Sequence, residues 1–210
     1  MLTETIKSMC KIQSSVQIPI NRTGQTLKAN FISFKGNDEI TEKEHFAIGL
    51  GDFKNNPVPM VRIHSECMTG DVFASLRCDC GHQLTEGLNR ISEVGGYILY
   101  LRQEGRGIGL FKKLEAYQLQ NEGYNTYEAN RMLGFEDDQR NFDVAAEMLK
   151  ALGHEEIDLL SNNDRKKVQL EENGITIRSV FSTFVYVNEF NERYLKAKKE
   201  KGNHNLVINE

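Results

Sequence analysis

Three cysteines of this chain have a spacing that suits a metal ion. Ten residues separate Cys67 from Cys78, and a single residue separates Cys78 from Cys80. Three thiolates can fill three of the four tetrahedral positions around Zn²⁺, and a catalytic zinc keeps the fourth for a water whose pKa falls to about 7. A structural zinc completed by a fourth Cys or His, or a group of buried free thiols, would use the same spacing. The cysteines alone therefore predict a metal site and leave its catalytic role open.

A glycine-rich basic turn is the second feature that could bind a ligand. Residues 102–110 (RQEGRGIGL) carry three alternating glycines between an expected strand and an expected helix. Backbone N–H groups and a helix N-terminus at such a turn can face an anion, and Arg102 and Arg106 add donors that suit phosphate. The pattern is neither a Walker A motif nor GxGxxG, and a tight turn without a ligand would use the same glycines.

The hydrophobic pattern predicts the elements that position these features. Up to residue 64 it alternates or forms short apolar runs, and after residue 80 helical spacing begins. Gly95 should end the first long helix, and Thr126 is the candidate N-cap of a short one. We expect strands at 16–20, 27–34, 45–51, 58–64, 97–101, 157–161 and 175–180, a polar loop at 35–44, and helices at 84–94, from 110 for about 13 residues, and at 126–133, 141–152, 165–172 and 190–201.

These elements predict an α+β (mixed α/β) fold, in which a β-rich N-terminal part is followed by alternating helices and strands. We expect a single catalytic domain over residues 1–210, with the β-rich part at about 12–64, a zinc and nucleotide core at about 61–175, and a C-terminal helix at about 190–201. The 210 residues are 39% hydrophobic and 27% charged, with a net charge of −4, which argues against a nucleic-acid partner. There is no apolar run of about 18 residues and no signal-peptide pattern, so we expect no membrane partner and a cytoplasmic protein.

Four segments of the chain resemble the GTP cyclohydrolase II family in its stand-alone form. They are VRIHSECMTGDVFASLRCDCGHQL (61–84), YLRQEGRGIGLFKKLEAYQLQ (100–120), TYEANRMLGFEDDQRNF (126–142) and LLSNNDRKK (159–167). The resemblance implies zinc-dependent hydrolysis of GTP at guanine C8, the first step of riboflavin biosynthesis. Formate and pyrophosphate would be released, and the product would be 2,5-diamino-6-(5-phosphoribosylamino)pyrimidin-4(3H)-one. It also implies one Zn²⁺ per subunit, Mg²⁺ bound with the triphosphate, and a homodimer.

The resemblance also assigns roles to residues. Asp138 matches a proton acceptor, Arg140 a nucleophile toward the α-phosphate, and Tyr117 a tyrosine that helps complete the second hydrolysis. A guanidinium is always protonated and is a poor nucleophile, so stabilisation of the departing pyrophosphate is an alternative role for Arg140. The metal ligands would be Cys67, Cys78 and Cys80. The substrate contacts would be Arg62, Ile63, His64, Ser65, Glu66, Gln83, Glu104, Gly105, Arg106, Thr126, Ser161 and Lys166.

The sequence departs from the family pattern at a few positions. Ser161 stands where the family usually has Thr, Asp164 replaces a usual Pro, and Asn125 replaces a usual Asp. Asp164 brings a negative charge close to Lys166, so we expect weaker phosphate attraction or a looser turn there. Two other functions stay open: a diverged paralogue that stops at the formamidopyrimidine or serves a specialised pathway, and a non-catalytic zinc protein that senses guanine nucleotides.

Overall fold

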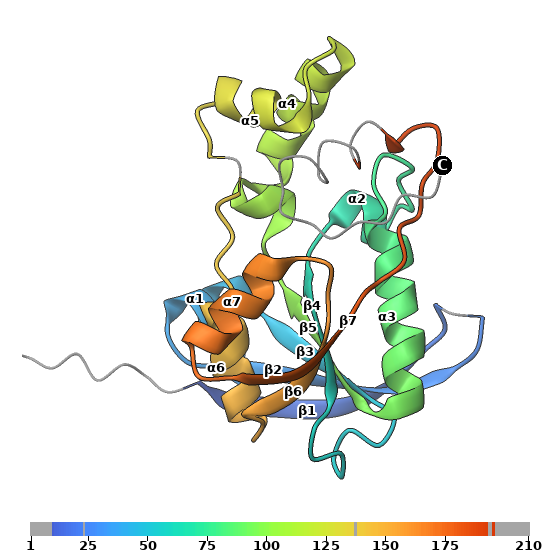
Figure 1. The fold of residues 1–210 in the computed structure, drawn as a ribbon, viewed down its shortest axis with the longest axis vertical. Coiled ribbons are helices and arrows are strands. Elements are labelled where there is room, and N and C mark those ends of the chain that lie inside the picture. The colour runs from blue at the N-terminus through green and yellow to red at the C-terminus, as the bar shows by residue number, and fades with distance from the viewer. Residues whose placement is uncertain (1–9, 23, 137, 193–194, 196–210) are drawn as a thin grey trace, which may run out of the picture.

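A seven-stranded mixed sheet forms the centre of the molecule (Figure 1). The computed structural model describes residues 10–22, 24–136, 138–192 and 195. The strand order is β1-β2-β3-β5-β4-β6-β7; the pairs from β1 to β5 are antiparallel, and those from β5 through β4 and β6 to β7 are parallel. The strands are β1 (Lys11–Ile20), β2 (Leu27–Lys35), β3 (Phe46–Leu50), β4 (Met60–Ser65), β5 (Gly96–Leu101), β6 (Glu156–Leu160) and β7 (Thr176–Phe181).

Successive side chains of a strand point to opposite faces of the sheet, and two hydrophobic cores form, one on each face. In β2, Leu27 and Ala29 pack into one core, whereas Ile32 and Phe34, on the opposite face, pack into the other. Helix α3 (Cys80–Val94) covers the first core with an apolar stripe that includes Leu88. Helices α6 (Asp143–Ala151) and α7 (Asp164–Glu172) contribute to the second core. Of the parallel strands, β4, β5 and β6 are buried on both faces, which explains their short, continuous apolar runs, whereas the edge strand β7 is mostly exposed.

The remaining helices lie around the end of the sheet where the parallel strands terminate. They are α1 (Asp38–Lys43), α2 (Met68–Asp71), the 3₁₀ turn η1 (Glu104–Gly107), α4 (Gly109–Asn121) and α5 (Thr126–Met132). Figure 1 shows α4 and α5 projecting beyond this end, with α2 near the start of α3. Ligands of α/β sheets bind outside the carboxyl ends of parallel strands, so this is the edge at which a site is expected.

The mixed α/β class and most predicted elements are confirmed, and a few predictions are wrong. Residues 35–44 contain α1 instead of only a polar loop, because the Asn37 side chain accepts a hydrogen bond from the Ile40 N–H and Ile40 is fully buried. Asn125, and not Thr126, is the N-cap of α5, where it forms a capping box with Glu128. The predicted helix at 190–201 falls mostly outside the described residues. Within the described part of the chain, no helix is long and apolar enough to cross a bilayer.

Candidate functional site

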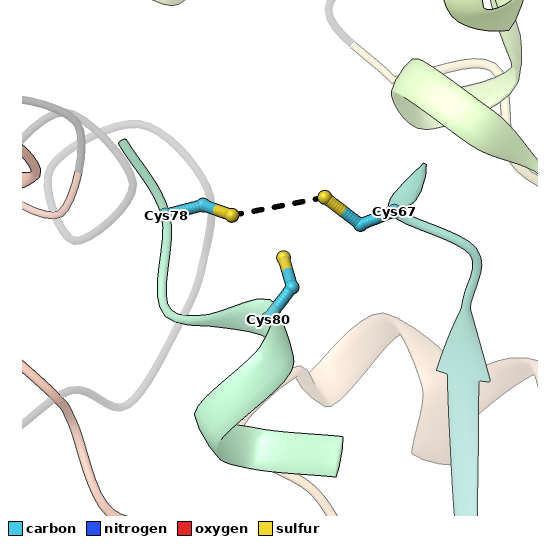
Figure 2. Close-up of side chains that lie close together, drawn as sticks. All are labelled: Cys67, Cys78 and Cys80. Carbon is cyan, nitrogen blue, oxygen red and sulfur yellow. Dashed lines mark hydrogen bonds between the residues drawn. The ribbon is translucent and has the colours of Figure 1, made fainter. Parts of the chain in front are cut away.

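The three cysteines converge at one point (Figure 2). Cys67 follows β4 and directly precedes α2, Cys78 lies in the turn before α3, and Cys80 is the first residue of α3. Their ligand atoms all lie within 4.8 Å of one another, and the Cys67 and Cys78 sulfurs are 3.7 Å apart. Sulfurs around a tetrahedral zinc, with Zn–S bonds of about 2.3 Å, are separated by about 3.8 Å. The predicted cluster is therefore assembled as a possible metal site, and its Cys67–Cys78 distance matches the spacing around zinc.

Gly70 makes this close packing of sulfurs possible. A Cβ atom at position 70 would lie 2.8 Å from the Cys78 sulfur and 3.2 Å from the Cys67 sulfur. The backbone of α2 therefore approaches the thiols as closely as only glycine allows. All three cysteines are free thiols in this arrangement.

The charge of the cluster also favours a cation. Hydrogen bonds from Cys78 and Cys80 hold the pKa of the Cys67 thiol well below its usual range, and the Lys113 ammonium adds to this effect. The hydrogen bonds with Cys67 raise the pKa of the Cys78 thiol to about 11 and also raise the pKa of the Cys80 thiol. A metal ion binds the thiolate form of cysteine, so metal binding at this cluster would be coupled to the release of protons from the thiols.

The Asp71 carboxylate fixes the position of the Cys67 backbone. Its carboxylate accepts hydrogen bonds from the Cys67 backbone N–H at 3.0 Å, the Tyr100 hydroxyl at 2.9 Å and the His64 ring Nε2 at 3.0 Å. Burial lowers the pKa of His64, so this imidazole is neutral near pH 7. His64 thus supports the metal site through Asp71, and it also lines the neighbouring cleft.

Arg22, which lies between β1 and β2, ties together the segments that carry the cysteines. Its guanidinium donates to the backbone carbonyls of Asp71 at 2.5 Å and Gly81 at 3.5 Å, and to the Thr85 hydroxyl at 3.1 Å. The arginine therefore links the end of α2 to the start of α3. No sequence signal pointed to Arg22, because its partners lie 49 to 63 residues away along the chain.

A cleft with about 1110 Å³ of empty space opens beside the thiols. Every predicted metal, substrate and catalytic residue lines it except Ile63 and Asp138. The Ile63 side chain is buried in the core, and only its carbonyl reaches the site, where it accepts a hydrogen bond from Lys166 Nζ at 2.7 Å. The additional lining residues, which the sequence did not single out, are Gln103, Ile108, Lys113, Ala116, Gln120, Asn130, Asn162, Asn163 and Thr183.

Arg140 is held in the cleft by a two-bond ion pair with Asp138. Its Nε and Nη2 atoms lie 2.8 and 2.6 Å from the two carboxylate oxygens, and Nη1 lies 3.4 Å from the Ser65 hydroxyl. Burial opposes ionisation of Asp138, but Arg140 outweighs it and holds the pKa of this carboxyl below its ordinary value. Arg165 donates to the backbone carbonyls of Asp138 and Arg140 at 3.0 and 2.7 Å, and therefore fixes this turn from α7.

The glycine-rich turn adopts a left-handed backbone. Gly105, Arg106 and Gly107 have φ values of 63°, 64° and 99°, and such values are uncommon for a residue with a Cβ, such as arginine. The Arg106 guanidinium lies over the Tyr127 ring, 4.8 Å from its centroid, at the cleft wall. Arg102 does not line this cleft and instead pairs with Glu66 at 3.3 Å.

A buried polar chain lies along α3. Arg62 donates to the Gln83 side-chain oxygen at 3.0 Å, and the Gln83 amide donates to Asp79 at 2.6 Å. Each end of the Gln83 amide keeps one further hydrogen-bonding position, because an amide has two donors and two acceptor lone pairs. Gln83 is therefore fixed in orientation and can still bind a ligand.

Ser161 and Asp164, which differ from the family pattern, form contacts with the chain close to them. The Ser161 hydroxyl accepts a hydrogen bond from the Asn163 N–H at 3.0 Å, and the Asn163 side chain caps α7 by accepting from the Arg165 N–H. Asp164 is the first residue of α7, where a negative charge is favourable beside the helix dipole. The weaker phosphate attraction or looser turn expected from Asp164 stays a prediction.

Lys113 is the most informative residue that the sequence analysis missed. Its ammonium lies 3.2 Å from the Cys67 sulfur and 2.9 Å from the Glu104 carboxylate. Lys113 precedes Tyr117 by four residues on α4, so the sequence indicates that the two share a face, but nothing in the sequence indicates the contact between Lys113 and Cys67.

Comparison with known proteins identifies relatives along nearly the whole chain. The sequence profile of the family described as GTP cyclohydrolase II matches residues 12–182. A GTP cyclohydrolase-2 of Vibrio vulnificus is 50% identical over 204 residues, which cover 95% of this chain and 100% of that protein. The riboflavin biosynthesis protein RibBA of Bacillus velezensis is 46% identical over 96% of this chain and 52% of its own length. Among solved structures, a two-domain 3,4-dihydroxy-2-butanone 4-phosphate synthase from A. baumannii aligns with a TM-score of 0.44 and 17% identity over 85% of this chain and 41% of that chain.

Proposed function

The chain belongs to the GTP cyclohydrolase II family of hydrolases, and from this premise we propose that residues 1–210 act as one catalytic domain that opens the guanine ring of GTP with zinc. The products are formate, pyrophosphate and 2,5-diamino-6-(5-phosphoribosylamino)pyrimidin-4(3H)-one, in the first step of riboflavin biosynthesis. The observation that carries the proposal is the convergence of three thiols in a cleft that also gathers Arg106, Arg140 and Lys166.

Cys67, Cys78 and Cys80 would hold one zinc ion per subunit. When bound, the ion supplies a Lewis acid and lowers the pKa of a coordinated water toward neutrality. Guanine C8, between two ring nitrogens, is the electrophilic carbon of the substrate. A metal held by Cys67, Cys78 and Cys80 at the cleft wall would assist both the ring opening and the hydrolysis of the resulting formamide.

Glu66 and Gln83 are the residues we assign to the guanine edge. Both side chains line the cleft, and Gln83 is oriented by Arg62 and Asp79 as described above. A carboxylate can accept hydrogen bonds from the guanine N1–H and its exocyclic amine, whereas adenine presents an acceptor at N1. The wrong base would leave buried polar groups unpaired, and this is an effective basis for discrimination.

The triphosphate would lie against the basic wall of the cleft. Arg106, Arg140 and Lys166 bring positive charge there although the chain as a whole has a net charge of −4. The η1 turn adds backbone N–H groups at the start of α4. Mg²⁺ bound with the triphosphate would neutralise part of its negative charge.

Arg140 is best suited to electrostatic stabilisation. Its guanidinium is paired at two nitrogens with a carboxylate that stays ionised, so Asp138 orients the positive charge and does not remove its proton. A fixed positive charge at this position stabilises the negative charge that develops as pyrophosphate leaves. We therefore assign Arg140 this role in preference to covalent attack on the α-phosphate.

Tyr117 is suited to proton donation near the thiols. Burial raises the pKa of its hydroxyl to about 12, so the phenol stays protonated at neutral pH. Its ring lies 4.5 Å from the Arg77 guanidinium, which holds the side chain at the cleft wall. A protonated phenol there can orient the formamide or donate to its nitrogen during the second hydrolysis.

A product assay tests the proposal. Zinc-loaded protein is incubated with GTP and Mg²⁺, and the products are identified by mass spectrometry. Formate, pyrophosphate and the diaminopyrimidine are expected. A product that retains the formyl group would point to the diverged paralogue, and tight GTP binding without turnover would point to a nucleotide sensor. Sedimentation of the same sample tests the homodimer that we also propose, and cell fractionation tests its cytoplasmic location.

A further inference from the structure

Lys113 is a buried cation in direct contact with one of the three sulfurs. Its Nζ atom lies 3.2 Å from the Cys67 sulfur, 3.0 Å from the Thr69 hydroxyl and 2.9 Å from Glu104 Oε1. An ammonium has three N–H donors, so these contacts can use all of them. The side chain is only 10% exposed, and a charge so buried is retained only where its partners compensate for the lost hydration.

Glu104 fixes the ammonium in place. Its second carboxylate oxygen accepts a hydrogen bond from the Met68 backbone N–H at 2.6 Å, at the start of α2, and Oε1 accepts from the Gly105 N–H at 2.8 Å. The carboxylate is therefore anchored to the helix that follows Cys67 and to the glycine-rich turn. Lys113, held by this anchor, cannot move away from the sulfur without breaking several buried hydrogen bonds.

Cys67 is therefore held through both its backbone and its side chain. Asp71 accepts a hydrogen bond from its backbone N–H at 3.0 Å, and Lys113 donates to its sulfur. Three thiolates and a divalent ion carry a net charge of −1, and an adjacent ammonium offsets it. A donor to a thiolate also withdraws electron density from the sulfur, which makes the bound ion a stronger Lewis acid.

We propose that Lys113 is a positioning residue of the metal centre: its ammonium holds the Cys67 sulfur in place, tightens zinc binding and tunes the electronic character of that sulfur. The inference rests on the proposed zinc site and is independent of whether GTP is turned over. It distinguishes Lys113 from the neighbouring Lys112, which is 46% exposed and pairs with Glu115 at 2.7 Å.

Lys112 and Lys113 form a matched pair for the test. Lys113→Met keeps an unbranched side chain that is one atom shorter and removes its donors and charge, and Lys112→Met makes the same change outside the site. Zinc dissociation constants are measured by competition with a chromophoric chelator. We expect Lys113→Met to weaken zinc binding by about 10- to 100-fold, the range found when partners of metal ligands are removed, and Lys112→Met to stay within about twofold of the parent protein.

Cobalt substitution separates an electronic role from a structural one. In Co²⁺-loaded protein, the sulfur-to-cobalt charge-transfer band should shift in Lys113→Met, stay unchanged in Lys112→Met, and return toward the parent position in Lys113→Arg, which restores an N–H donor. If Lys113→Met fails to fold, Lys113→Leu, which also lacks the charge and the N–H donors, takes its place in both measurements.

The outcomes separate this inference from the proposed function. A parent protein that binds no zinc overturns both. A parent protein that binds zinc, together with a folded Lys113 variant whose zinc affinity and cobalt spectrum match the parent, overturns the role of Lys113 alone. Weaker zinc binding with a shifted band supports it, whether or not GTP is consumed.

Discussion

Gly70→Ala is a change of one methyl group that should damage the metal centre without damaging the fold. The new Cβ would lie 2.8 Å from the Cys78 sulfur, 3.2 Å from the Cys67 sulfur and 3.2 Å from Cys80 Cβ. Ordinary contact begins at 3.4 Å, so the Cys78 sulfur or the α2 backbone has to move by at least 0.6 Å (3.4 − 2.8). Metal–ligand distances tolerate deviations of only about 0.2 Å, so the three sulfurs lose their tetrahedral spacing.

The helix propensity of alanine should stabilise α2, so the substitution is expected to affect the metal site and the fold in opposite directions. Alanine is favoured over glycine by about 1 kcal/mol inside a helix, and position 70 lies within α2. We therefore expect the zinc-free variant to unfold within about 4 °C of the zinc-free parent, since 1 kcal/mol shifts the midpoint of a chain of this size by about 2–4 °C. Zinc affinity should fall at least about tenfold, or about 1.4 kcal/mol.

Two measurements check Gly70→Ala. Thermal unfolding in the presence of a chelator reports on the fold, and chelator competition reports on the zinc dissociation constant. Val72→Ala is the control, because Val72 directly follows α2 and is 63% exposed. Zinc affinity equal to that of the parent in Gly70→Ala would refute the inference that the glycine is required by the sulfurs.

Three further changes test the surroundings of the cleft. Arg165→Met removes two charge-assisted hydrogen bonds from the Asp138–Arg140 turn and should lower kcat about tenfold, with KM for GTP changed less, in steady-state assays. Because the pKa of Asp138 is below its ordinary value of 3.8, its pairing with Arg140 stabilises the fold above about pH 4 and this contribution is lost on further acidification. The difference in the free energy of unfolding in urea between the parent and Asp138→Asn should therefore be constant above about pH 5 and shrink toward pH 3. A difference that grows on acidification would contradict this prediction. Asn162→Ala breaks two buried hydrogen bonds to the Thr183 backbone and should cost about 2 kcal/mol, seen as a fall of roughly 4–8 °C in Tm.

The features predicted well from the sequence depend on residues that lie close together along the chain. The apolar alternation of β2 and the helical spacing of Leu84, Leu88 and Ile91 in α3 each lie within a short stretch of chain, and both elements form as predicted. The segment at 11–15 of β1 (KIQSS) was missed because Ile12 is its one apolar residue, so it has no alternation of apolar and polar side chains. Helix α1 was missed although Asn37 and the acidic residues after it form a recognisable N-terminal signal.

The features that could not be predicted depend on contacts between distant parts of the chain. Lys113 meets Cys67 across 46 residues, and Arg22 meets Asp71 across 49. The sequence contains no periodicity that links such pairs. Lys113 meets Cys67 because the parallel strands β4 and β5 bring their carboxyl ends to one edge, whereas Arg22 comes from the connection between the antiparallel strands β1 and β2. Arg165 was passed over for the same reason, since its partners are carbonyls 25 to 27 residues away, whereas its neighbour Lys166 was assigned through the family resemblance.

The most direct test of the central claim follows the carbon atom that the zinc site is proposed to attack. GTP labelled with ¹³C at guanine C8 is incubated with the zinc-loaded protein and Mg²⁺, and the label is followed by NMR. The account predicts that the label appears in free formate, in equal amounts with pyrophosphate, and that Cys78→Ser gives neither product. Label that remains in the intact purine, or free formate produced at the parent rate by Cys78→Ser, would contradict it.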